Sequence, residues 1–166
     1  NLLKQTYITG KNFKDNIQII ESGLFYKTDP SSVFKANSCT LLGVCHIDHL
    51  HWLKDKTIDG VIHEKTSTLL NSNIFINKQV TEDIRDKIEK SLIKNTSNKY
   101  YFGKNFNISK SENGFIQYED EIGKIILPEP NILGEHQLYN ISTSIAAARK
   151  IFKVKDDDIK KGIQSI

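Results

Sequence analysis

The stretch SCTLLGVCHIDHLHW, residues 38–52, places an apolar run directly before a cluster of histidines. The run over 38–45 is short and does not alternate with polar residues, which predicts a buried strand covered on both faces. In open α/β sheets, ligands bind outside the carboxyl ends of the strands. We therefore expect the residues from His46 to His51 to lie at a strand end where chemistry takes place.

Strand-like and helical patterns alternate on either side of this stretch. Short apolar runs over 16–22 and 72–79 predict two further buried strands. Helical spacing of apolar residues predicts helices over 56–70 and 81–96, and Thr81 is the expected N-cap of the second helix. Strands that alternate with helices indicate an α/β layer with a mostly parallel sheet.

The pattern changes between Tyr100 and Leu133. Alternating or apolar segments are separated there by Asn-Gly and Ile-Gly turns, which predicts a small antiparallel meander. A strongly helical segment follows over 137–152, and another helix is expected to begin with Asp156 as its cap. The predicted fold class is therefore α/β, a mostly parallel sheet flanked by helices with a small antiparallel β insertion.

Composition excludes several classes of protein. The 166 residues carry a net charge of +3 from 23 basic and 20 acidic side chains, which are mixed along the chain. This balance argues against a nucleic-acid partner or an anionic membrane, and no apolar run approaches the roughly 20 residues that span a bilayer. Cys39 and Cys45 flank one strand-like run, too far apart to pair, so we predict reduced thiols in a cytoplasmic protein.

The histidine cluster has three interpretations. Cys45, His46, His49 and His51 offer atoms that zinc prefers, but four neighbouring ligands do not wrap one tetrahedral ion without a second cluster elsewhere. A magnesium-nucleotide site at the strand end fits better, although histidine is an unusual Mg²⁺ ligand. The third interpretation is a solvated loop without chemistry.

Three longer stretches carry further patterns. IDHLHWLKDKTIDGVIHEKTSTL, residues 47–69, is similar to I-G-L-D-H followed by a loop and E-K-A-G-I. ESGLFYKTDPSSVF, residues 21–34, is similar to E-V-G-L-G-G-R-L-D-A-T-N-V. ILGEHQLYNISTSIAAARKIF, residues 132–152, is similar to L-x-G-x-H-Q-x-x-N-A-x-x-A-I-x-A. Taken in chain order, 21–34, then 47–69, then 132–152, the three patterns resemble the central ATPase domain of the Mur ligase superfamily, in its folylpolyglutamate synthase/dihydrofolate synthase branch.

The resemblance implies a metal site. Glu21 and His49 would be Mg²⁺ ligands beneath the phosphates of ATP. Lys65 would be the lysine that this family carbamylates, and the carbamate would help to hold a second Mg²⁺. His49 and Lys65 are thus the implied catalytic residues. The pattern alone, without the resemblance, favours a helix-face lysine that reaches water.

The resemblance also implies a nucleotide pocket. Asn140 would contact the adenine, and His136 and Gln137 would support the pocket. Without the motif, these three side chains would be interpreted as a polar helix cap.

The activity implied by the resemblance is amide-bond formation. An ATP-dependent ligase of this family adds L-glutamate to folate or dihydropteroate through an acyl phosphate. We expect a cytoplasmic, monomeric enzyme with ATP and Mg²⁺ as cofactors. The alternative is a degenerate, inactive ligase-like domain that acts at most as a binding module.

The chain departs from the family pattern in two ways. TGKNF, residues 9–13, lacks the glycine and Ser/Thr of a phosphate loop, and bulky Phe25, Tyr26 and Lys27 replace G-G-R. We expect the aromatic pair to obstruct close approach of a substrate. Since the sequence begins with Asn1 and ends at Ile166 within a helical pattern, we interpret 1–166 as a partial central ATP-binding domain. The N-terminal phosphate-loop segment and the C-terminal glutamate-ligase domain would be missing.

Overall fold

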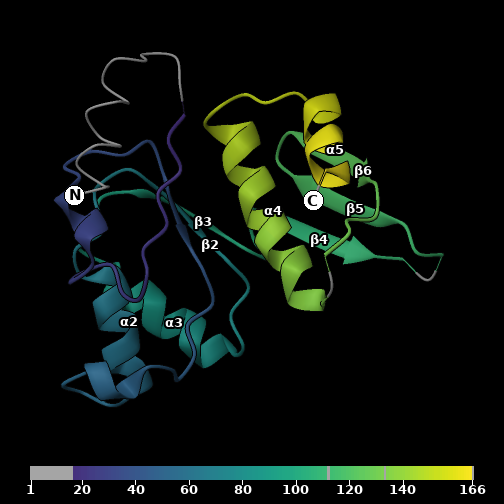
Figure 1. The fold of residues 1–166 in the computed structure, drawn as a ribbon. Helices are drawn as coiled ribbons and strands as arrows, with labels where there is room; N and C mark the ends of the chain where they lie inside the picture. Colours follow the sequence, from purple (N-terminus) through teal and green to yellow (C-terminus); the bar gives the residue numbers. More distant parts are fainter. Residues whose placement is uncertain (1–16, 112, 133, 166) are drawn as a thin grey trace.

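The computed structural model describes residues 17–111, 113–132 and 134–165 in three layers (Figure 1). Two helices cover one face of a parallel sheet, and α4 with a small antiparallel sheet covers the other face. The residues 9–13, which we compared with a phosphate loop, lie outside the described part of the chain.

The parallel sheet has the order β1-β2-β3. Its strands are β1 (Thr40–Leu42), β2 (Asn73–Ile76) and β3 (Asn98–Tyr101). The helices α2 (Ile58–Thr66) and α3 (Glu82–Ser91) contact each other beside it. Parallel strands and helices alternate as predicted, which confirms the α/β class.

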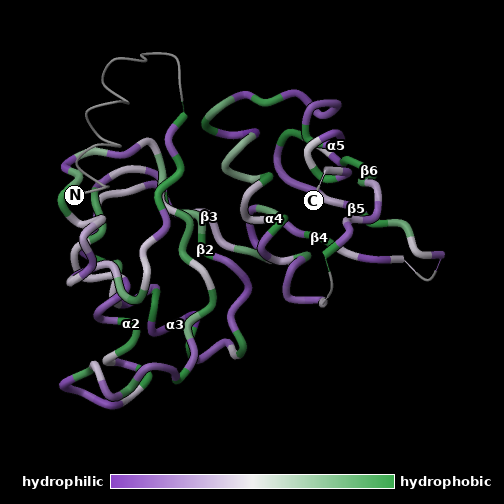
Figure 2. The backbone as a smooth tube through the Cα atoms, viewed as in Figure 1, coloured by the Kyte–Doolittle hydropathy of each residue, from purple (hydrophilic) through white to green (hydrophobic). Residues whose placement is uncertain are grey.

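The central strand β2 is covered on both faces, as an uninterrupted apolar run predicts. Ile74 and Ile76 belong to the core cluster that α2 and α3 complete. Phe75 points to the opposite face, where its ring stacks on that of Tyr100 with centroids 4.7 Å apart. Figure 2 shows the resulting hydrophobic stretch along β2.

The predicted antiparallel meander is present. It consists of β4 (Phe106–Lys110), β5 (Ile116–Asp120) and β6 (Gly123–Leu127) in sequential order. The turn between β4 and β5 contains Gly114 at φ +82°, a left-handed conformation that glycine adopts without steric cost. Tyr118 of β5 is fully buried at the centre of this half.

Two helices complete the fold, α4 (Glu135–Lys150) and α5 (Asp156–Gln164). Helix α4 lies between the two sheets and contacts strands of both, whereas α5 contacts β6 (Figure 1). In the described residues, no helix has the length and apolar character that a membrane span requires.

Two strand predictions need correction. Residues 17–22 form no strand, and the side chains of Ile17 and Ile19 are 58% and 92% exposed, because no described strand pairs with this segment. The run over 38–45 forms only the three-residue edge strand β1. Its Leu41 is 46% exposed, so coverage on both faces was a wrong expectation there.

Two boundaries also differ from the prediction. The segment that begins the predicted meander, around Tyr100, belongs to β3 and joins the parallel sheet. Asp156 is the first residue of α5, while Lys155 is the N-cap, and no side chain caps the helix. Asp156 instead pairs with Arg149 of α4, with Oδ1 3.4 Å from Nε. A long-range ion pair therefore engages the side chain that was expected to cap.

Candidate functional site at the carboxyl ends of β1 and β2

The site begins where β1 ends. Cys45 is fully buried, and its backbone N–H donates to Oε1 of Gln79 over 2.9 Å. Burial raises the pKa of the Cys45 thiol to about 11, against the opposing effect of the Lys65 charge. Cys39 and Cys45 are both free thiols, as predicted.

The loop after Cys45 leads into a short 3₁₀ helix, Leu50–Trp52. His49 precedes it at φ +52°, in the left-handed region. Asp48 lies between two half-exposed imidazoles, with Oδ2 3.5 Å from Nε2 of His46 and 3.3 Å from Nε2 of His49. The backbone N–H of His49 donates to Asp48, and this bond lowers the pKa of that carboxyl.

The zinc interpretation gains no support from this geometry. Cys45 is buried in the core, while the imidazoles of His46 and His49 are about half exposed on the loop. Across the described ranges, no three His, Cys, Asp or Glu side chains are grouped so that they could hold a metal ion.

Glu21 lies in a segment without regular secondary structure that leads to α2. Asp29 accepts hydrogen bonds from the backbone N–H groups of Gly23 and Ser31, each at 2.8 Å, and caps the 3₁₀ helix Pro30–Val33. Burial alone would raise the pKa of Asp29, but these bonds favour the carboxylate and lower its pKa overall. The segment that follows Glu21 is therefore held in shape by the Asp29 carboxylate and its two backbone donors.

The aromatic departure from the family pattern has a structural role. Phe25 is 5% exposed and packs with Leu53 and Val61 in a small core cluster. The Phe25 ring is therefore part of the core, and the expectation that the aromatic pair obstructs a substrate stays a prediction. Lys27 binds Glu64 of α2 twice, through its backbone N–H at 3.2 Å and its Nζ at 3.3 Å.

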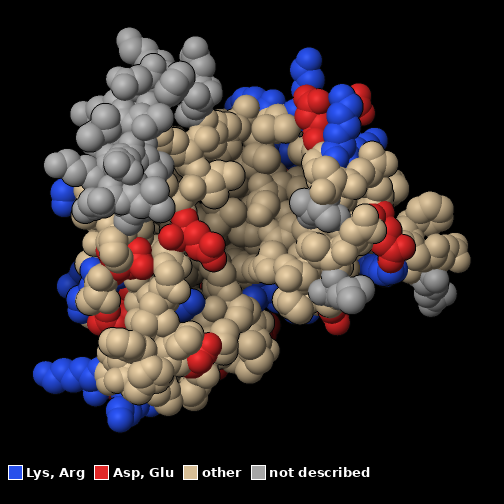
Figure 3. Space-filling model, in the orientation of Figure 1, with Lys and Arg blue, Asp and Glu red and all other residues tan. Residues whose placement is uncertain are grey.

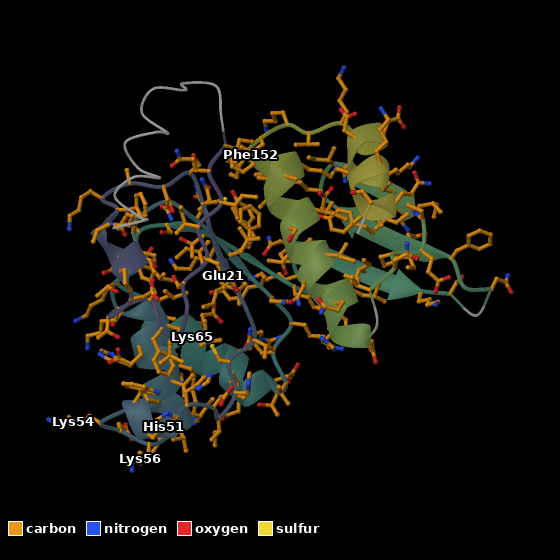
Figure 4. The ribbon with its side chains drawn as sticks, in the orientation of Figure 1. Glu21, His51, Lys54, Lys56, Lys65 and Phe152 are labelled. Atoms are coloured by element: carbon orange, nitrogen blue, oxygen red, sulfur yellow. The ribbon has the colours of Figure 1, made fainter. Side chains whose placement is uncertain are left out.

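The three implied metal ligands are not all brought together. The Lys27–Glu64 pair ties the segment that carries Glu21 to the helix that carries Lys65. Figure 4 places Glu21 and Lys65 towards the middle of the molecule and His51 at its outer end. Among the described residues, no contact joins His49 to Glu21 or Lys65, and His49 instead faces Asp48.

Figure 3 shows that this face is hollowed between the parallel-sheet half and α4. Most of the surface within the hollow is uncharged, and acidic atoms lie at its border where Figure 4 places Glu21. A carboxylate at the edge of an otherwise uncharged hollow is free to meet a cation or a donor-bearing ligand.

The implied nucleotide residues lie at the start of α4. Gly134 precedes the helix at φ +104°, and the His136 ring lies so close that a Cβ at Gly134 would be 2.6 Å from it. Asn140 accepts a hydrogen bond from Nδ2 of Asn77 at 2.7 Å and donates to Oε1 of Gln137 at 3.0 Å. Asn140 and Gln137 are thus brought together, and Asn77 ties them to the end of β2.

Sequence reasoning missed Asn77 and Gln79. Asn77 follows the apolar residues of β2 directly and Gln79 lies two residues further on. The backbone N–H of Cys45 donates to Gln79, and Gln79 donates to the Asn77 carbonyl at 2.8 Å. The signal for both is their place after the carboxyl end of a buried parallel strand, where α/β proteins bind ligands.

Comparisons with known proteins identify the fold. No protein-family model and no curated protein sequence matches the chain. Solved structures do match. The apo form of L. casei FPGS has a TM-score of 0.80 at 19% identity, over 96% of this chain and 40% of that chain. The chain has the fold of a folylpolyglutamate synthase.

Two further structures agree. The folylpolyglutamate synthase from Thermotoga maritima has a TM-score of 0.80 at 15% identity, over 98% of this chain and 38% of that one. E. coli FolC in complex with DHPP and ADP has a TM-score of 0.72 at 20% identity, over 87% and 33%. The chain thus spans about two fifths or less of these proteins that share the folylpolyglutamate synthase fold.

Proposed function

We propose that this chain is the ATP-binding part of a ligase that adds L-glutamate to folate or dihydropteroate. Proteins of the same fold have been solved with AMPPCP and folate and with DHPP and ADP, which supports this choice of substrates. We propose further that a phosphate loop and a glutamate-ligase domain lie in parts of the protein outside residues 1–166. The whole protein would be a cytoplasmic monomer.

The hydrogen bond between Asn77 and Asn140 gives the proposal its main support. It joins the start of α4, where the implied nucleotide residues lie, to the end of β2. Through Gln79 and Cys45, the same polar chain reaches the surroundings of Lys65. The implied nucleotide residue Asn140 is therefore connected to the carboxyl ends of β1 and β2, the edge of a parallel sheet at which α/β proteins bind ligands, and this supports the proposal.

The donor set suits Mg²⁺ in part. Glu21 is exposed, and within the described residues no cation pairs with its carboxylate, so its oxygens are open to a metal. A carbamate on Lys65 would add oxygen donors of the kind that Mg²⁺ prefers, and His49 would supply an imidazole nitrogen. Bound Mg²⁺ would neutralise the oxygens of the transferred phosphoryl group.

The reaction divides into two balanced steps. A substrate carboxylate oxygen attacks the γ-phosphorus of ATP, so that ADP leaves and an acyl phosphate forms. The amine of glutamate then attacks the acyl carbon, releases inorganic phosphate and a proton, and leaves an amide. In this scheme Asn140 and Gln137 orient the base, while Glu21, His49 and Lys65 act at the phosphates, so positioning and electrostatics carry the catalysis.

The test is glutamate-dependent release of ADP, with dihydropteroate or tetrahydrofolate as acceptor. It uses the full-length protein that the gene encodes, with His49→Ala and Lys65→Ala as variants and His51→Ala as the matched control from the same loop. We expect both variants to lose at least about a hundredfold in kcat/KM while the control stays within about threefold. Wild-type turnover that survives both substitutions would refute the assigned roles.

A degenerate binding domain is the second candidate, because Phe25, Tyr26 and Lys27 replace the glycine-rich segment of the family pattern. It predicts that the full-length protein binds ATP or the pterin substrate without glutamate-dependent ADP release. The same assay, accompanied by calorimetric titration of each ligand, separates the two candidates.

A further inference from the structure

Asn77 occupies a position from which it controls the orientation of Asn140. It follows β2 directly and is 5% exposed, whereas Asn140 is exposed at the start of α4. The two side chains are joined by the 2.7 Å hydrogen bond from Nδ2 of Asn77 to Oδ1 of Asn140. A buried amide thus holds an exposed one that comes from a distant part of the chain.

The backbone determines which way round the Asn77 amide lies. The N–H of Lys78 approaches the Asn77 side chain at 2.7 Å, and a backbone N–H only donates. The side-chain atom that it meets is therefore the oxygen, and the amino group of Asn77 faces Asn140. The Asn140 atom that receives this donor is in turn its oxygen, so its amino group is the atom that donates to Gln137.

A second amide holds Asn77 itself in place. The backbone N–H of Cys45 donates to Oε1 of Gln79 at 2.9 Å, which identifies that atom as the oxygen. The Gln79 amino group then donates to the carbonyl of Asn77 at 2.8 Å. Both the backbone and the side chain of Asn77 are consequently fixed by donors and acceptors that cannot exchange roles.

The remaining hydrogen-bonding capacity of Asn140 follows by counting. An amide has two N–H donors and two acceptor lone pairs, and Asn77 and Gln137 use one of each. One donor and one acceptor are left for a ligand. A 6-aminopurine presents the complement, an exocyclic N–H donor beside a ring-nitrogen acceptor, whereas a 6-oxopurine has a carbonyl acceptor in place of that donor.

We propose that Asn77 is a positioning residue that makes this site select a 6-aminopurine nucleotide over a 6-oxopurine nucleotide. This inference rests on the proposed function, in which Asn140 meets the base. Asn77 acts through Asn140 and does not touch the ligand. Without its donor, the exposed Asn140 amide turns over and offers its amino group to a 6-oxo oxygen, so selectivity is lost while folding and phosphate contacts remain.

The experiment measures the dissociation constants of Mg-ATP and Mg-ITP for the full-length protein, because their bases differ only in the group at position 6 and in the proton that hypoxanthine carries on N1. Asn77→Asp keeps the shape and the acceptor for Lys78 but loses the donor when ionised. Asn77→Ser avoids burying a charge, and its hydroxyl donates or accepts without fixing either role. Asn73→Asp is the matched control, since Asn73 lies at the amino end of the same strand and binds Ser38.

The expected wild-type preference for ATP over ITP is at least about fivefold, in line with one paired donor and acceptor on a base edge. In both Asn77 variants this ratio should fall towards one, and in the Asn73 control it should not change. Circular dichroism checks that each variant is folded. Should Asn77→Asp fail to fold, the Asn77→Ser variant carries the test.

Three results would overturn the inference. An unchanged ratio in a folded Asn77 variant would show that Asn77 does not set selectivity. Equal losses of affinity for both nucleotides would indicate a purely structural role. A wild-type protein that binds neither nucleotide would overturn the proposed function together with this inference, so the two failures are distinguishable.

Discussion

The two halves of the molecule are held together by different means. In the parallel-sheet half, α2 and α3 begin at Thr57 and Thr81, whose side chains accept from backbone N–H groups inside the helices. In the other half, the N-cap residues are Gly134 for α4 and Lys155 for α5, and neither makes a side-chain hydrogen bond to its helix. At their amino ends, α2 and α3 are thus capped by a neighbouring side chain, whereas α4 and α5 have no such cap and rely on tertiary contacts.

The second half has a buried polar lock in place of caps. Arg149 of α4 and Asp120 of β5 are 5% and 8% exposed, and their side chains meet at 2.7 Å. The Tyr118 hydroxyl donates to the same carboxylate at 2.9 Å, and Asp156 of α5 contacts the guanidinium. Three elements, α4, β5 and α5, thus share one network, at the carboxyl end of α4 and away from the site residues at its start.

The parallel-sheet half has short strands and exposed apolar side chains beside the site. Ligand-binding regions are drawn from the less stable parts of proteins, because polar groups that must meet a ligand do not also complete the core. The contrast teaches that the buried polar network lies towards the carboxyl end of α4, whereas the candidate site joins the start of α4 to the carboxyl end of β2. Four experiments, in order of expected effect, would break or sharpen it.

Removal of the buried lock should have the largest effect. Arg149→Ala leaves Asp120 buried without its cation, so we expect a loss of about 3–5 kcal/mol in the free energy of unfolding. Chemical denaturation measures the loss. The control Lys124→Ala removes an exposed pair, Lys124–Glu119, and should cost less than about 1 kcal/mol. Similar losses in both variants would contradict a locked half.

Two helical glycines should respond in opposite directions. A Cβ at Gly60 of α2 would lie 2.1 Å from the backbone oxygen of Asp55, so Gly60→Ala should destabilise by about 1–3 kcal/mol and displace the loop that carries His49. Nothing lies within 4 Å of a Cβ at Gly162 of α5, so Gly162→Ala should stabilise by about 0.5–1 kcal/mol. Thermal denaturation of both variants measures these changes. A Gly60→Ala variant as stable as the wild type would disprove the close approach of Asp55 to Gly60.

Loss of a helix cap should have a smaller effect. Thr81→Ala removes the acceptor for the backbone N–H of Ile84, and we expect a cost of about 1 kcal/mol. Thr96→Ala, at an exposed position outside the helices, is the control and should be nearly neutral. Hydrogen exchange of the first turn of α3 should accelerate in Thr81→Ala only. Unchanged exchange there would show that tertiary packing, not the cap, holds this end.

The smallest perturbation is alkylation of the native protein. The raised pKa of Cys45, about 11, leaves about a thousandth of its thiol ionised at pH 8, and full burial blocks access as well. Burial also raises the pKa of Cys39, but that thiol is only half-buried. Iodoacetamide followed by mass spectrometry should label Cys39 first, and label both more quickly at higher pH. Earlier labelling of Cys45 would mean that the parallel-sheet half opens readily.

Sequence patterns predicted the parts of the molecule that depend on neighbouring residues. The Thr81 cap, the glycine turn at Gly114 and the apolar run of β2 each follow from a few adjacent side chains. The motif resemblance likewise indicated the fold that the solved structures share. It also directed attention to Asn140 and Gln137, which the structure brings into contact.

Tertiary structure alone decided the rest. The sheet that β3 joins depends on its pairing with β2, and the role of Asp156 depends on Arg149. The orientation of Asn140 depends on Asn77, which lies 63 residues earlier in the chain. Local propensity reflects the backbone and side chains within a turn or two, whereas these contacts arise only when separate elements pack and desolvate each other's polar groups. The sequence by itself therefore determined the helices, the cap at Thr81 and the meander from Phe106 onwards, and packing decided which strands pair and which polar groups meet.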